Sequence, residues 1–190
     1  MVEGQAVETA VASILKALGE DAGREGLRDT PRRVARMYSE LFSGVGVDPR
    51  SAIDAIFEEE RHEEAVVVLR GVPFYSMCEH HLMPFYGQAH MGYVPKSKIA
   101  GASKLVRALE VAARRPQIQE RLTAQVADAV HDVLDTAGTG VVIEAEHLCM
   151  SMRGVQKRGS VVVTSATRGD FDEAGVRRSQ LMSMVQGRAA

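Results

Sequence analysis

The segment SMCEHHLMPFYG, residues 76–87, places a cysteine, a glutamate and two histidines side by side in a chain that has only two cysteines. Zinc sites draw on cysteine and histidine, with close pairs separated by two to four residues. Cys78 and His81 form such a pair, and Cys149 supplies a third candidate ligand. Catalytic zinc sites use three protein ligands and keep one position for water, which then ionises near neutral pH. The spacing therefore favours a catalytic metal site.

His147 adds to this pattern because it precedes Cys149 by two residues in a segment predicted to be a strand. Side chains at i and i+2 on a strand share a face, so both are expected to point into the same space. Three of the six histidines, His80, His81 and His147, thus lie within three residues of a cysteine. The remaining histidines are predicted to be ordinary surface or core residues: His62, His90 and His131.

Other interpretations of the cysteines stay open at this level. Free cysteine is among the most buried residue types, so Cys78 and Cys149 can be two ordinary core thiols. A disulfide between them is a second alternative. A closed structural zinc site, with His80 or His147 as the fourth ligand, is a third.

Length and composition describe an ordinary globular protein. The 190 residues, 45% hydrophobic and 25% charged, suit one domain with an appendage. A formal net charge of −2 argues against a polybasic nucleic-acid binder. No apolar run approaches the roughly 20 residues of a membrane helix, and the start MVEGQAVETA has no features of a secretory signal. Together with the two cysteines, this predicts a reduced, cytoplasmic protein without nucleic-acid or membrane partners.

The N-terminal part of the chain is predicted to be helical. Apolar residues recur at helical spacing over residues 7–18, and Thr30 with Pro31 predicts the N-cap and first position of a helix that continues to residue 42. A short helix is expected at 52–57, followed by the acidic linker EEERHEE. Residues 1–63 are therefore predicted to form an N-terminal helical extension.

The remainder, residues 64–190, is predicted to be the catalytic domain. Its strands and helices alternate in blocks, as expected for an α+β fold in which a helix pair covers one face of an antiparallel four-stranded sheet. The open edges of such a sheet favour assembly with further copies. The expected strands are 65–72, 87–94, 141–150 and 160–169; the expected helices are 102–114, 117–135 and 173–186; PKSKIAG, 95–101, is expected to be a loop.

Four motifs in the same order carry a family resemblance: MCEHHLMPFYG, GASKLVR, RRPQIQERLT and EHLCMSMRGVQK. The chain resembles type I GTP cyclohydrolase, the zinc enzyme of folate and pterin biosynthesis. The resemblance implies the tunnelling fold, with a ββααββ core, and a homodecamer of two pentameric rings with active sites between subunits. It implies conversion of GTP to 7,8-dihydroneopterin triphosphate with release of formate, the first step of tetrahydrofolate biosynthesis.

The resemblance also implies roles for single residues. The zinc ligands, with one Zn²⁺ per subunit, fall on Cys78, His81 and Cys149. The acid/base histidine falls on His80, and a second catalytic histidine falls on His147. An imidazole suits proton transfer to the purine because its ordinary pKa of about 6.5 lies near the operating pH.

Substrate-binding positions follow in the same way. The resemblance places guanine recognition on Glu120, whose carboxylate accepts from N1–H and the N2 amino group, with Gln119 in the same pocket. The triphosphate is expected to bind near the start of the helix predicted at 102–114, a natural anion site. The family positions there and beyond Cys149 are Ser103, Lys104, Arg107 and Arg153.

Plainer interpretations stand beside these roles. Without the resemblance, Gln119 and Glu120 are polar residues at a helix start, and Lys157 and Arg158 belong to a solvated turn. Two other functions compete: a purine- or pterin-binding protein with a structural zinc, and a tunnelling-fold nitrile reductase of deazapurine metabolism with a cysteine nucleophile and no zinc. The CxxH pair and Cys149 argue against the latter.

Overall fold

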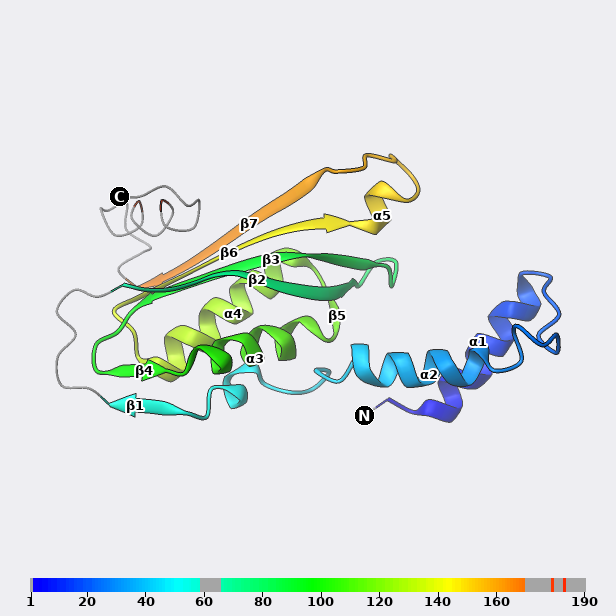
Figure 1. Cartoon of the computed structure of the whole chain (residues 1–190), viewed down its shortest axis with the longest axis horizontal. Helices are drawn as coiled ribbons and strands as arrows, with labels where there is room; N and C mark the ends of the chain where they lie inside the picture. Colours follow the sequence, from blue (N-terminus) through cyan, green and yellow to red (C-terminus); the bar gives the residue numbers. More distant parts are fainter. Residues whose placement is uncertain (1, 59–65, 170–178, 180–182, 184–190) are drawn as a thin grey trace.

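A five-stranded mixed sheet, in place of the predicted four-stranded antiparallel one, forms the centre of the fold (Figure 1). Its long strands are β2 (Val67–Cys78), β3 (Pro84–Val94), β6 (Gly138–His147) and β7 (Val161–Gly169), and the short strand β5 (Pro116–Gln117) runs parallel to the end of β2. The order across the sheet is β5-β2-β3-β6-β7. Residues that alternate along these strands pack against helices on one side only, and the predicted α+β class is confirmed.

The helices α3 (Ala102–Ala113) and α4 (Gln119–Leu134) cover one face of the sheet. The Ser76 hydroxyl donates to the Ala113 carbonyl at 2.7 Å, which holds the end of α3 against β2. Burying a large aliphatic side chain contributes about 1.5–3 kcal/mol, so the apolar stripes of both helices stabilise this layer. Buried residues of this core include Phe85, Ala89, Met91, Tyr93, Leu105, Leu109, Leu122, Val126, Val130, Leu134, Val141 and Ile143.

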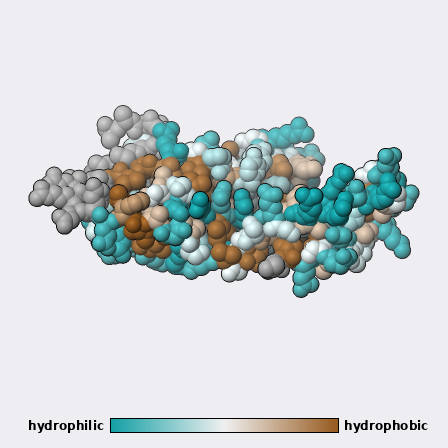
Figure 2. Space-filling view, turned by 60° about the horizontal axis from the view of Figure 1, so that its bottom comes forward, coloured by the Kyte–Doolittle hydropathy of each residue, from teal (hydrophilic) through white to brown (hydrophobic). Residues whose placement is uncertain are grey.

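The N-terminal helices α1 (Gly4–Ala17) and α2 (Thr30–Leu41) pack against each other and extend from the domain as an arm. The helix α2 begins at Thr30 itself, one residue before the predicted start, with Asp29 at the N-cap position. Figure 2 shows largely hydrophilic surface on the arm. Hydrophobic surface gathers toward the opposite end of the molecule.

Three short elements differ from the sequence-based expectation. The predicted helix at 52–57 is instead a 3₁₀ turn, η1 (Pro49–Ala52), followed by strand β1 (Ile56–Glu58). The predicted loop 95–101 contains β4 (Lys98–Ala100), which pairs with β1. The predicted strand 141–150 ends at His147, and residues 148–151 form the helical turn α5 (Leu148–Ser151). Each element is too short for its own periodicity to be read.

The structure, a computed structural model, describes residues 2–58, 66–169, 179 and 183. The acidic segment EEERHEE, apart from its first residue, lies outside the described residues, and so does most of the helix predicted at 173–186. Within the described part of the chain, no helix has the length and apolar character needed to cross a membrane. The boundary predicted at residue 63 stays a prediction.

Gly87 in β3 offers a test of the sheet packing beside the site. A Cβ atom there would lie 1.8 Å from the Glu144 carbonyl oxygen of β6, a contact that only a backbone shift can relieve. We expect Gly87→Ala to cost about 3 kcal/mol, as severe overpacking does. A lowered chemical-denaturation midpoint would report this loss.

The matched control is Gly4→Ala in α1, where no atom lies within 4 Å of the added carbon. It is expected to leave the midpoint unchanged or slightly higher, since alanine favours a helix over glycine by about 1 kcal/mol. A Gly87→Ala protein with an unchanged midpoint would contradict the packing described for β3 and β6.

Candidate metal centre

The connection between β2 and β3 carries the first two candidate ligands. The Cys78 N–H donates to the Met83 carbonyl at 2.8 Å, and the Leu82 N–H donates to the Cys78 carbonyl at 2.8 Å. Leu82 closes this tight turn with a φ of 50°, in the left-handed region. The turn leaves Cys78 buried, while His80 and His81 are exposed at its tip.

Cys78, His81 and Cys149 converge, with one ligand atom of each residue lying within 4.8 Å of the others. Zinc–sulfur and zinc–nitrogen bonds of about 2.0–2.3 Å separate tetrahedral ligands by about 3.5 Å, so small side-chain movements suffice to coordinate an ion. The Nδ1 atoms of His80 and His81 both lie 3.9 Å from the Cys78 sulfur, yet His80 is outside the three-residue group. The group can bind a metal ion, as the spacing predicted.

Cys149 reaches the group from α5, not from a strand. The expectation that His147 and Cys149 share a strand face is therefore wrong, because β6 ends at His147 and the chain turns there. Burial and the neighbouring Cys78 raise the pKa of the Cys149 thiol, and Arg153 opposes this rise. A bound cation would favour the thiolate, which is the form that coordinates metals.

His147 is held on two sides. Its ring stacks on Phe85 with centroids 4.6 Å apart and an interplanar angle of 1°, and its Nε2 lies 2.8 Å from Gln119 Oε1. The Gln119 amide nitrogen donates to the carbonyls of Ile143 at 3.0 Å and Val162 at 2.9 Å. Because those donations turn Oε1 toward His147, the histidine must donate from Nε2, and its Nδ1 is left as an acceptor when the ring is neutral.

Burial lowers the pKa of His147, against the opposing charge of Glu120. This favours the neutral ring, in which Nε2 keeps the proton that bonds to Gln119 and Nδ1 is an acceptor. The predicted substrate residue Gln119 is itself almost fully buried, with 1% of its surface exposed. Its contact to His147 was not predicted, since nothing local in the sequence connects residues so far apart.

A second unpredicted contact ties the ligand-bearing turn to α4. The Glu79 carboxylate accepts two bonds from the Arg121 guanidinium, at 2.6 and 3.2 Å, and the Glu79 N–H donates to the Gln117 carbonyl at 2.9 Å. Bidentate arginine–carboxylate pairs fix geometry as well as charge. Glu79 therefore holds the turn without belonging to the metal group.

The Glu79–Arg121 pair predicts a change in metal affinity. We expect Arg121→Met to weaken Zn²⁺ binding about tenfold, because residues that orient ligands affect affinity by about 10- to 100-fold. Competition with a chromophoric chelator measures the change. Arg24→Met is the matched control, since Arg24 forms an exposed pair with Glu20 on the arm. Equal Zn²⁺ affinities of the two variants would contradict this role of Arg121.

The predicted substrate residues fall into two groups at opposite ends of α3. Glu120 is exposed in the first turn of α4, and Arg153 follows α5, so both lie at the metal end. Ser103, Lys104 and Arg107 lie on the first turns of α3, near β4 (Figure 1). At about 1.5 Å of rise per residue, Lys104 is about 14 Å along the helix from the α3 end that contacts β2.

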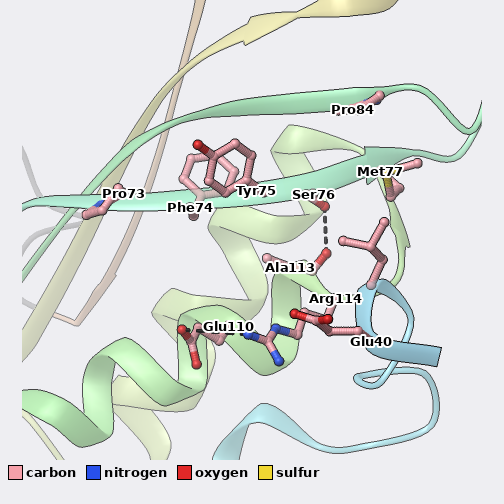
Figure 3. A pocket seen from close by; sticks show the side chains of 11 residues that line it. Glu40, Pro73, Phe74, Tyr75, Ser76, Met77, Pro84, Glu110, Ala113 and Arg114 are labelled. Atoms are coloured by element: carbon pink, nitrogen blue, oxygen red, sulfur yellow. Dashed lines mark hydrogen bonds and ion pairs between the residues drawn. The ribbon is translucent and has the colours of Figure 1, made fainter. Parts of the chain in front are cut away.

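A cavity of about 380 Å³ lies between β2 and the ends of α2 and α3 (Figure 3). Phe74, Tyr75 and Ser76 line it from the strand, and Glu40 and Arg114 line it from the helices. None of the predicted site residues contributes to this lining. The metal group thus lies outside this cavity, at the end of the sheet where the β2–β3 turn and α5 meet.

The fold and the site define an α+β protein with a thiol–imidazole metal group at one end of its sheet. The GTP cyclohydrolase I family profile matches residues 7–186. A relative named GTP cyclohydrolase 1 from Halalkalibacterium halodurans is 53% identical over 98% of both chains, and one from Carboxydothermus hydrogenoformans is 54% identical over 97% of this chain and 96% of its own. This chain belongs to the GTP cyclohydrolase I family, which confirms the resemblance and the assignment to an enzyme family.

Among solved structures, the archaeosine synthase QueF-Like in the apo form aligns with a TM-score of 0.45 and 14% identity. The alignment covers 57% of this chain and 97% of that one.

Proposed function

We propose that this chain is a cytoplasmic, zinc-dependent GTP cyclohydrolase that converts GTP to 7,8-dihydroneopterin triphosphate and formate, the first step of tetrahydrofolate biosynthesis. The observation that carries the proposal is the convergence of Cys78, His81 and Cys149 in a chain of this family. Two relatives that match 98% of this chain carry the name GTP cyclohydrolase 1.

The donor set fits zinc. Two thiols and one imidazole are ligands that zinc prefers, and three protein ligands are typical of a catalytic site. Among the described residues, no fourth cysteine, histidine or carboxylate joins the group, which argues against a closed structural site. A divalent ion held there acts as a Lewis acid that activates water near neutral pH.

The two remaining histidines are proposed to move protons. His80 shares the exposed turn with His81, and its Nδ1 is 3.9 Å from the Cys78 sulfur, so it lies beside the proposed metal site. We assign it the proton that N7 of guanine takes up as C8 is attacked. His147 donates from Nε2 to Gln119, which leaves Nδ1 to accept a proton during ring opening or rearrangement.

Guanine recognition is assigned to Glu120. Its carboxylate is exposed in the first turn of α4 and is close enough to His147 to influence that ring electrostatically. A carboxylate pairs with the adjacent N1–H and N2 amino donors of guanine, a pattern that adenine lacks. Gln119 contributes by supporting His147, and we propose that its side chain acts on the substrate through that ring.

The triphosphate is assigned to Ser103, Lys104, Arg107 and Arg153. Because the first three lie at the far end of α3 from the metal group, a site that contains both groups is most simply built from two copies of the chain. The exposed apolar residues Tyr75, Val161 and Val163 on the helix-free face of the sheet support assembly. We therefore propose the tunnelling-fold decamer, two rings of five, with active sites between subunits and residues 1–63 as a peripheral arm.

Removal of a ligand tests the chemistry. Cys149→Ala is expected to lose bound zinc and to lower GTP turnover by about a thousandfold or more, because water activation is lost. Pterin fluorescence and metal analysis of the same sample measure both. Met152→Ala, which truncates an exposed side chain beside α5, is the control and should retain both properties. Full turnover by metal-free Cys149→Ala would refute the assignment, and zinc binding without turnover by the unaltered chain would indicate a binding protein.

Co-expression of two variants tests whether each active site is built from two subunits. Cys149→Ala and Lys104→Met are each expected to be inactive as pure proteins. When they are co-expressed in equal amounts, random assembly leaves about one quarter of inter-subunit sites with both groups intact, so about a quarter of the activity should return. Activity that stays at the level of the pure variants in verified mixed assemblies would mean that each site lies within one chain.

A further inference from the structure

Asp54 lies against the first turn of α3, in the segment between η1 and β1. The pairing of β1 with β4 holds this segment in place, and the Gly101 N–H donates to the Ala55 carbonyl at 3.4 Å. The Asp54 carboxylate forms an ion pair with the Lys104 ammonium. Neither the motifs nor the roles described above involve Asp54.

The two partners of this ion pair differ in their access to water. The Lys104 side chain is only 16% exposed, whereas the Asp54 side chain is 62% exposed. An ammonium that is largely withdrawn from water needs a counter-ion, while an exposed carboxylate can return to water at small cost. The Asp54 side chain is therefore the exchangeable member of the pair.

Charge around the pair keeps Asp54 ionised. Its hydrogen bond to Lys104 lowers the pKa of the carboxyl group, and Arg107 contributes in the same direction. The first turn of α3 carries no acidic residue, and its N-cap, Gly101, offers no side-chain acceptor to the helix N–H groups. Asp54 thus brings a carboxylate to the first turn of α3 through its ion pair with Lys104.

We propose that Asp54 is an exchangeable counter-ion that occupies Lys104 in the empty protein and competes with the phosphates of the substrate for it. An anion with one or two charges gains little by displacing a carboxylate. A triphosphate brings several charges that Lys104, Arg107 and the helix N-terminus bind together. Displacing Asp54 costs every anion that binds Lys104 the same free energy, and the several contacts of a triphosphate offset this cost best. This inference rests on the proposed role of Lys104 in binding the triphosphate.

Calorimetric titration of the full-length assembly with inorganic tripolyphosphate and with orthophosphate tests the inference. Asp54→Asn keeps the shape of the side chain and removes its charge. We expect tripolyphosphate, and orthophosphate that binds at Lys104, to bind about three- to tenfold more tightly, because the competing charge is gone. Asp135→Asn is the matched control, since Asp135 pairs with the exposed Lys96 elsewhere on the surface; it should bind both anions as the unaltered chain does.

Lys104→Met separates the inference from the function on which it rests. If Lys104→Met weakens tripolyphosphate binding while Asp54→Asn leaves it unchanged or weaker, Asp54 is not a competitor and the inference is wrong, although the phosphate site stands. If Lys104→Met binds tripolyphosphate as tightly as the unaltered chain does, the role of Lys104 fails and the inference fails with it.

Discussion

The metal group depends on the register between β3 and β6. In that pairing Phe85 lies opposite His147, at the point where β3 leaves the turn that holds Cys78 and where β6 enters α5. A slip of one residue would turn every side chain of β6 to the other face of the sheet. His147 would then lose both Phe85 and Gln119, and Cys149 would be displaced from Cys78. The long antiparallel pairing, with its packed apolar face, thus sets the distance between two ligands that are far apart in the sequence.

The helix α4 supports the same arrangement from below the sheet. Its first turn holds the ligand-bearing turn through Arg121 and Glu79, and it holds His147 through Gln119. Gln119 also bonds to the carbonyls of Ile143 and Val162, which belong to different strands. One helix start therefore orients residues from both segments of the site, and the packing that stabilises the fold also positions the chemistry.

The sequence predicted those features that local patterns determine. Periodicity identified the long helices and three of the four long strands to within a few residues, but β2 continues six residues beyond its predicted end, to Cys78. The metal group followed from residue type and spacing. The short elements β1, β4, β5 and α5 were missed because each depends on a partner supplied by another part of the chain. The prediction of a strand at Cys149 was wrong for this reason, although the Cys149 side chain still lies close to Cys78.

Local sequence patterns could not predict the contacts around the site. Glu79 and Arg121 are unremarkable as single residues, and their pairing requires the docking of α4 beside the β2–β3 turn. The pairing of Asp54 with Lys104 likewise requires η1 and β1 to lie along α3. A charged residue has many possible partners of opposite charge in the sequence. Only the tertiary fold decides which of them it contacts.

The position of α3 has a topological consequence for assembly. In the function proposed above, the metal group and the proposed phosphate-binding residues of α3 lie at opposite ends of this helix, so each chain would offer two complementary half-sites. An open row of copies joined head to tail would leave one half-site unmatched at each terminus. Only closure of the row into a ring would match every half-site, and the number of complete sites would then equal the number of chains.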